Sequence, residues 1–224
     1  MKFENTEVWG FEHAIRGMRN PLESWNKSDS HYDIEEVMVD EEVVLERGKY
    51  IIGSNDLQLA QTLIRAESEH RKFLRQIFVA VDITAPLYFF KELDTYKVGT
   101  VANSTSTMHK LASTPITCDC FEMDDFEDCK DDSNVYVSAI WIESITRLEK
   151  LRQKYNATKD KRYWKELIRL LPESWLQKRT ITMNYENILN MYRQRKNHKL
   201  TEWSKSFCDW VKTLPYAEEL ICLE

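Results

Sequence analysis

The sequence predicts an α+β fold in one domain over residues 1–224, with few strands and several helices packed around them. Several segments repeat apolar residues every three or four positions, which is the spacing of an amphipathic helix. Two shorter segments are rich in β-branched and apolar residues, as half-buried strands are. The chain has only 5 glycines and no glycine-rich phosphate loop, which argues against the usual dinucleotide-binding and P-loop folds.

The first half of the chain predicts helices around one strand. Leu59 and Leu63 have helical spacing, and the β-branched run that ends at Thr84 is typical of a strand. The expected elements are a short helix and an irregular segment over 9–30, a helix over 56–73 capped by Asp56, a strand over 74–84, a helix opened by Pro86, and a polar loop over 98–110.

The second half predicts helices on both sides of another strand. The strongest helical pattern lies over 135–155, where apolar residues recur at three and four positions. The expected elements are an acidic insertion loop near 117–134, helices over 135–155 and 161–171, a strand over 174–184, and helices over 185–197 and 199–214. Pro172 and Pro215 end the helices that precede them.

Composition limits the kind of protein this is. Hydrophobic residues make up 42% and charged residues 30%, which is typical of a folded globular protein. The net charge of −6 argues against broad nucleic-acid binding, which needs a basic surface. No apolar run approaches the roughly 20 residues of a membrane span, and the N-terminus lacks a signal-peptide pattern. We therefore expect a soluble, cytoplasmic protein without a membrane partner, and the odd number of cysteines, 5, fits a reducing compartment.

The most specific motif lies in the C-terminal third. Asn184 stands twelve residues after Pro172 and ends a strand as Thr182-x-Asn184, and Arg195 follows eleven residues later at a helix end. Asn184 is suited to cap the helix, and Arg195 to present a bidentate fork to a phosphate. The alternative interpretation is an ordinary strand-to-helix junction with a solvated arginine.

This segment resembles the flavin-dependent thymidylate synthases, in which a Leu-Pro, a strand ending Thr-x-Asn and a helix ending Leu-Arg have the same spacings. The resemblance implies a small, mostly antiparallel sheet packed with helices. It also implies reductive methylation of dUMP to dTMP, with FAD as cofactor and with NADPH and methylene-tetrahydrofolate as co-substrates. Sites in that family lie between the subunits of a homotetramer.

The family signature RHRxxSxNExSxR has a partial counterpart in YKVGTVANSTSTMHK. Asn103 and Ser106 match its asparagine and second serine. Lys91 and Glu92 stand where the family has an Arg-Gln pair. By resemblance, the expected substrate-binding residues are Arg195, Ser106, Asn103 and Glu92, and the expected cofactor-binding residues are Lys97, Lys91, His70, Asn184 and His109. For His70, a helix-end cap or a surface residue is the alternative.

Four residues depart from the family pattern. Val101, Ser104 and Met108 stand where the signature has serine, glutamate and its last arginine, and Glu186 replaces an arginine. The lost cations weaken the grip on phosphates. Two further hypotheses follow: a non-catalytic or repurposed relative that binds a nucleotide-like ligand or a protein partner, and an enzyme for another substrate.

Two other groups have competing interpretations. The N-terminal residues Arg16, Arg19, Asn20, Trp25 and Lys27 are suited to a phosphate and a base, or form an ordered surface loop.

The cysteines Cys118, Cys120 and Cys129 are spaced unlike a zinc site and lack a nearby fourth ligand other than His109, so no metal is expected. The acidic residues around them are typical of a solvated insertion loop.

Overall fold

The computed structural model describes residues 1–40, 42–123 and 128–223. The described elements are β1 (Lys2–Trp9), α1 (Phe11–Met18), β2 (His31–Val39), β3 (Glu42–Ile51), α2 (Ser54–Arg65), β4 (Phe78–Pro86), α3 (Leu87–Leu93), β5 (Val101–Ser104), α4 (Thr107–Lys110), α5 (Val137–Thr158), α6 (Lys161–Leu170), β6 (Leu176–Asn184), α7 (Tyr185–Arg195), α8 (Cys208–Lys212) and α9 (Ala217–Leu220). None of the described helices is long and apolar enough to cross a membrane.

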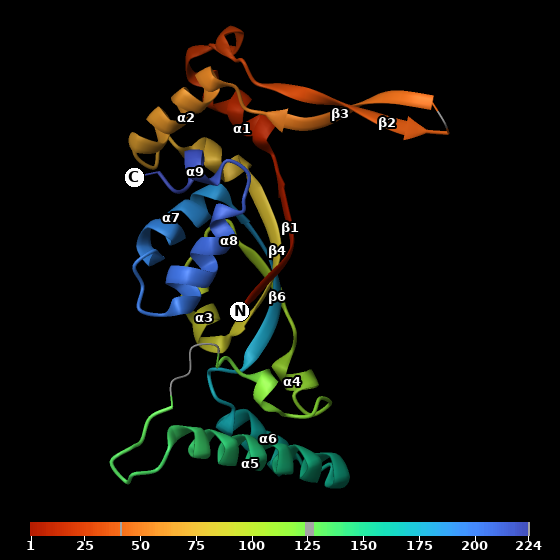
Figure 1. Cartoon of the computed structure of the whole chain (residues 1–224), viewed down its shortest axis with the longest axis vertical. Helices are drawn as coiled ribbons and strands as arrows, with labels where there is room; N and C mark the ends of the chain where they lie inside the picture. Colours follow the sequence, from red (N-terminus) through yellow and green to blue (C-terminus); the bar gives the residue numbers. More distant parts are fainter. Residues whose placement is uncertain (41, 124–127, 224) are drawn as a thin grey trace.

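The central feature is an antiparallel sheet with the strand order β1-β4-β6-β5 (Figure 1). β4 and β6 pair along their whole length, from Phe78 opposite Asn184 to Pro86 opposite Leu176. Alternate residues of β4 are buried, among them Val79, Val81 and Ile83. This period of two directs one face of the sheet into the core.

Helices α3, α7 and α8 lie on one side of the sheet in Figure 1. They join a large core cluster that also includes residues of β4, β6, α1 and α2. The other face of the sheet carries polar contacts: Thr180 donates to Asp82 at 2.6 Å and Lys178 to Glu4 at 3.0 Å. The sheet is therefore buried on one face only, as antiparallel sheets often are.

Two parts extend from this body. Helices α5 and α6 pack on each other at one end (Figure 1) around a small second cluster that includes Leu148 and Leu167. At the other end the hairpin β2–β3 projects away from the sheet. Tyr32 holds the root of the hairpin by donating to Glu12 of α1 at 3.0 Å.

The predicted fold class is confirmed: the protein is α+β, with small antiparallel sheets packed with helices. The expected helix over 56–73 is wrong at both ends. Gly53, not Asp56, is its N-cap, and the helix ends at Arg65 because Glu67 adopts a left-handed φ of 77°. The expected strand over 74–84 starts only at Phe78, since residues 72–76 form a tight 3-10 turn. Short apolar runs do not distinguish these two states.

Other segments differ more from their predicted secondary structure. The expected polar loop over 98–110 contains β5 and α4, and the N-terminal strands β1, β2 and β3 had no sequence prediction. The expected last helix over 199–214 consists of a π-helical turn, Glu202–Phe207, followed by α8. The core of the acidic insertion loop, residues 124–127, lies outside the described residues.

Candidate functional site

Arg195 lies at the C-terminal end of α7 and is held by side chains from the end of α3 and the segment that follows it. Its Nε donates to the Tyr96 hydroxyl at 3.0 Å, and its Nη2 donates to the Glu92 carboxylate. The guanidinium also lies over the rings of Trp203, at 5.4 Å, and Tyr96, at 5.7 Å. We call Glu92, Tyr96, Arg195 and Trp203 the Arg195 cluster. It fixes a planar cation between aromatic rings, where its direction is well defined.

The sequence around α7 explains why Arg195 is placed so firmly. Asn184 caps the helix by accepting from the Asn187 backbone at 3.0 Å, and the Asn187 side chain accepts from the Asn184 backbone at 3.2 Å. This reciprocal box satisfies two free N–H groups at the helix start. Arg195 lies in the last turn, where a cation complements the helix dipole. The expected cofactor role of Asn184 stays a prediction.

The chain that follows Tyr96 is fastened to the same helix start. Asn187 donates to the Val98 carbonyl at 2.7 Å. Gly99 has a φ of 78°, and a Cβ at this position would lie 2.9 Å from the Asn184 amide nitrogen. The backbone angle therefore favours glycine, and a Cβ would also have to displace the Asn184 side chain. Lys97 is exposed on this segment.

The matched signature residues lie just beyond, on β5 and α4. Asn103 pairs with Thr180 of β6 and is exposed. Ser106 is the N-cap of α4 and accepts from the His109 backbone at 3.3 Å, while the His109 side chain is exposed. Lys91 is exposed and donates to Glu173 at 2.7 Å. Among the described residues, two pairs of predicted site residues touch: His109 with Ser106, which are neighbours in sequence, and Glu92 with Arg195, which are far apart in it.

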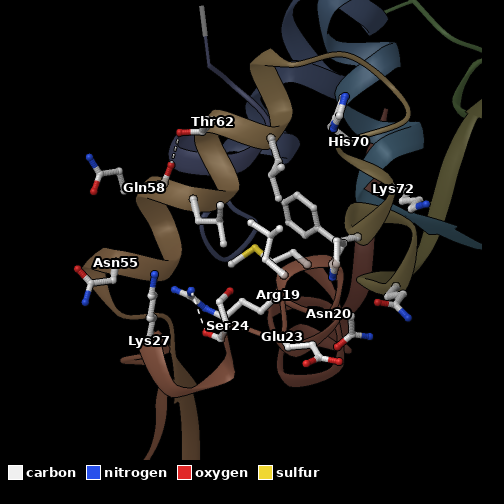
Figure 2. A pocket seen from close by; sticks show the side chains of 18 of the residues that line it. Arg19, Asn20, Glu23, Ser24, Lys27, Asn55, Gln58, Thr62, His70 and Lys72 are labelled. Atoms are coloured by element: carbon white, nitrogen blue, oxygen red, sulfur yellow. Dashed lines mark hydrogen bonds between the residues drawn. The ribbon is translucent and has the colours of Figure 1, made fainter.

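A large cleft lies between the segment after α1 and one side of α2 (Figure 2). Its volume is about 1600 Å³. Figure 2 shows Gln58 and Thr62 along α2, and Asn20, Ser24 and Lys27 across from them. The apolar lining residues are Met18, Leu22, Leu59, Leu63 and Phe73. The cleft thus combines an apolar floor with polar walls, as ligand sites do.

His70 and Lys72 lie along this cleft, on the segment that follows α2 (Figure 2). Both side chains are exposed, and Arg75 lines the cleft beside them. The structure therefore places His70 at the cleft, and within the described residues it makes no hydrogen bond or ion pair with the Arg195 cluster. No local motif in the sequence indicates Lys72 or Arg75.

Arg19 is at the edge of the cleft but is occupied. Its Nε donates to Asp56 at 2.6 Å, and the two side chains are only 5% and 0% exposed. Ser28 and Ser30 also donate to Asp56, each at 2.6 Å. Arg19 therefore has a structural role.

The other members of that N-terminal group are placed differently. Trp25 donates to Asn20 at 2.9 Å, within the same segment. Lys27 lines the cleft and Arg16 is exposed. The predicted ordered loop is thus the better description of this segment, with Lys27 left as its cation at the cleft.

Comparison with solved structures identifies the fold. Two crystal structures of flavin-dependent thymidylate synthase ThyX from Helicobacter pylori, each with FAD and dUMP, are similar to this chain. The first has a TM-score of 0.68 at 16% identity and covers 100% of both chains. The second has the same score and identity and covers 99% of this chain and 97% of that one. The chain has a ThyX-like fold. No protein-family model and no curated protein matches its sequence.

On this ThyX-like fold the departures from the signature lie at the surface. Val101 of β5 is opposite Thr182 and is exposed, and Ser104 is opposite Arg179. Met108 is exposed, and its carbonyl accepts from Trp164 at 3.3 Å. None of these three side chains supplies a positive charge. Any phosphate-binding cation must therefore come from elsewhere in the fold.

Glu186 is the exception among the departures, because it is buried. Arg71 donates to it at 3.3 Å, and Arg75 donates to its other carboxylate oxygen. An acid at a buried position needs a counter-charge. The sequence signal that could have revealed Arg71 and Arg75 was thus Glu186 itself, an acid where the resembled family has a cation.

The described residues fit a flavin dinucleotide in size and chemistry. The cleft of about 1600 Å³ exceeds the roughly 300–1000 Å³ of drug-sized pockets. Lys27, Lys72 and Arg75 offer cations along it for phosphates, and its apolar floor suits a flat ring. Among the described residues, no three or more His, Cys, Asp or Glu side chains are grouped to hold a metal.

Proposed function

We propose that this protein binds FAD and dUMP and acts as a flavin-dependent thymidylate synthase. One observation carries the proposal: Glu92 and Arg195, both expected to bind substrate, contact each other across 103 positions of sequence. This contact lies on a fold that is shared with proteins solved with FAD and dUMP.

The chemistry of the Arg195 cluster favours a pyrimidine ring over a phosphate. The Glu92 carboxylate neutralises the guanidinium, so the pair has little net attraction for a dianion. A uracil ring presents an N–H donor beside carbonyl acceptors. Arg195 can donate to a carbonyl while Glu92 accepts from the N–H. This differs from the phosphate contact to which the sequence motif suits Arg195.

The flavin would lie in the cleft, with Lys27, Lys72 and Arg75 near its phosphates and Leu59, Leu63 and Phe73 against apolar parts. When bound, it supplies hydride transfer from NADPH, and methylene-tetrahydrofolate supplies the carbon. The chain contributes binding, orientation and charge.

A second candidate function is nucleotide binding without turnover. Val101 favours it, because its exposed side chain has no hydroxyl where the family signature has serine. In contrast, the hypothesis that the N-terminal arginines serve another substrate loses support, since Arg19 is committed to Asp56.

Purified protein tests the proposal directly. We expect absorbance in the flavin bands, or its appearance after FAD is added, and a higher melting temperature with dUMP. Formation of dTMP that depends on NADPH and methylene-tetrahydrofolate separates the synthase from the non-catalytic candidate. Colourless protein that binds neither FAD nor dUMP would contradict both candidates.

We also propose that the protein assembles as a homo-oligomer, a tetramer by family resemblance, through the hairpin β2–β3. Opposed residues share a face, and one face of this hairpin carries, beside Glu36 and Arg47, the apolar residues Ile34, Met38, Val43 and Leu45, which are 60–67% exposed. A two-stranded ribbon with an exposed apolar face is marginally stable alone. A second copy of this chain would cover that face.

A further inference from the structure

Glu186 organises two arginines beside the cleft. The Arg71 Nε donates to one carboxylate oxygen at 3.3 Å, and the Arg75 Nε donates to the other. The Glu186 side chain is only 10% exposed. With two cations on one acid, the group keeps a positive charge.

The two arginines differ in their exposure and in the N–H donors that remain available for a ligand. The Arg71 side chain is 14% exposed, and its Nη2 also donates to Asn190 at 2.9 Å. The Arg75 side chain is 49% exposed and lines the cleft. Its described contacts use Nε and Nη2, which leaves Nη1 without a partner among the described residues. Arg75 is therefore an oriented cation with donors to spare.

The surroundings of Arg75 include charges of both signs. Lys72, His70 and Glu69 line the cleft beside Arg75. The hydrogen bond that Arg75 donates to Glu186 raises the pKa of Arg75, and the negative charge of Glu186 adds to this effect. Arg75 thus stays charged beside an anionic ligand.

We propose that Arg75 binds the phosphate groups of a ligand in the cleft, such as the pyrophosphate of a dinucleotide, and that Glu186 is the residue that positions it. The inference rests on the proposed function for the choice of a dinucleotide. A planar fork held at one edge presents its other edge to phosphate oxygens with little loss of side-chain freedom. This arrangement supplies a cation where Glu186 replaces the arginine of the resembled family.

Binding of ADP, inorganic pyrophosphate and adenosine to the full chain tests the role of Arg75. In Arg75→Gln we expect affinity for ADP and pyrophosphate to fall about tenfold, the usual effect of losing a charged hydrogen bond, with adenosine affinity unchanged. The control is Arg65→Gln, an exposed arginine outside the cleft. Equal affinities for the wild type and Arg75→Gln would overturn the inference.

Glu186→Gln separates positioning from simple charge. Removing an acid makes the region more positive, so charge alone predicts tighter pyrophosphate binding. Positioning predicts weaker binding, and no further loss when Glu186→Gln is added to Arg75→Gln. Circular dichroism and thermal melting check that each variant is folded. Tighter binding by Glu186→Gln would overturn the positioning role.

The outcomes for FAD keep this inference distinct from the proposed function. Pyrophosphate binding that depends on Arg75 without any FAD binding would support the anion site and contradict the synthase. FAD binding that is insensitive to Arg75→Gln would contradict the anion site at Arg75 and leave the proposed synthase supported. Wild-type protein that binds no phosphate ligand would overturn the inference.

Discussion

Some single residues of this chain stabilise the fold and others are candidates for ligand binding. Asp56 is a stabilising residue. It accepts from Ser28, Ser30 and Arg19, which join the segment after α1 to α2. Burial acts to raise its pKa, but the hydrogen bonds from the two serines and the charge of Arg19 outweigh burial and lower it. A carboxyl whose pKa is lowered in the folded state stabilises the fold at pH values above its usual pKa. This stability is lost as the pH falls through the lowered pKa.

We expect Asp56→Asn to destabilise the protein by about 3 kcal/mol at neutral pH, because it leaves Arg19 buried without a counter-charge. Urea unfolding measures the loss. Asp33→Asn, at an exposed position of the hairpin, is the control and should change stability by less than about 0.5 kcal/mol. Similar midpoints for both variants would contradict the structural role of this ion pair.

Arg195 shows the functional kind of residue. We expect Arg195→Lys to reduce dUMP affinity about tenfold, since lysine keeps the charge but loses the planar fork. Isothermal titration with dUMP measures the effect. Arg147→Lys is a matched control, because Arg147 is also paired with a glutamate, Glu143, but on α5. An unchanged affinity in Arg195→Lys would show that charge alone suffices or that dUMP binds elsewhere.

At the scale of elements, the long helix α5 depends on Glu149. This side chain accepts from Arg152 at 2.6 Å and from the Ile116 backbone at 2.8 Å. The hydrogen bond from Arg152, opposed by burial and aided by Ile116, lowers the pKa of Glu149 from its usual 4.5 to about 2. The carboxylate thereby ties α5 to the chain that precedes the acidic loop.

Glu149→Gln should lower stability by about 1–2 kcal/mol at neutral pH, through the lost charged hydrogen bonds. Because the pKa is lowered in the folded state, the wild-type advantage is full above pH 4.5 and disappears as the pH falls toward about 2. Thermal melts over this range check the sign. An advantage that grows on acidification would contradict it.

The accuracy of the element predictions follows the strength of local patterns. α5 matched its predicted segment closely because its apolar residues have a clear helical period, and β6 and α7 did so because Pro172 and Asn184 mark their ends. The hairpin was missed for a physical reason. Its strands are rich in glutamate, and Asp40, at its turn, adopts a φ of 49° without the Asn-Gly or Asp-Gly pair that marks tight turns.

At the scale of the whole molecule, the proposed assembly through β2–β3 is open to a direct test. We expect Leu45→Ser combined with Met38→Ser to shift the protein toward smaller species in sedimentation velocity, because the apolar contact is weakened. Glu46→Ser, on the opposite face of the hairpin, is the control. A wild type that sediments as a monomer would contradict the assembly, and unchanged species in the double variant would place the interface elsewhere.

The sequence by itself determined the α+β class and the order of the strong elements, and it offered Glu92 and Arg195 as separate site candidates. These depend on patterns within a few residues or on spacing along the chain. Only the tertiary structure decided which charges meet, because such pairs join groups far apart in sequence: Arg19 with Asp56 across 37 positions, and Arg75 with Glu186 across 111. Electrostatic and hydrogen-bond energies depend on distance in space. The fold therefore decided that Arg19 is structural and that Arg75 faces the cleft.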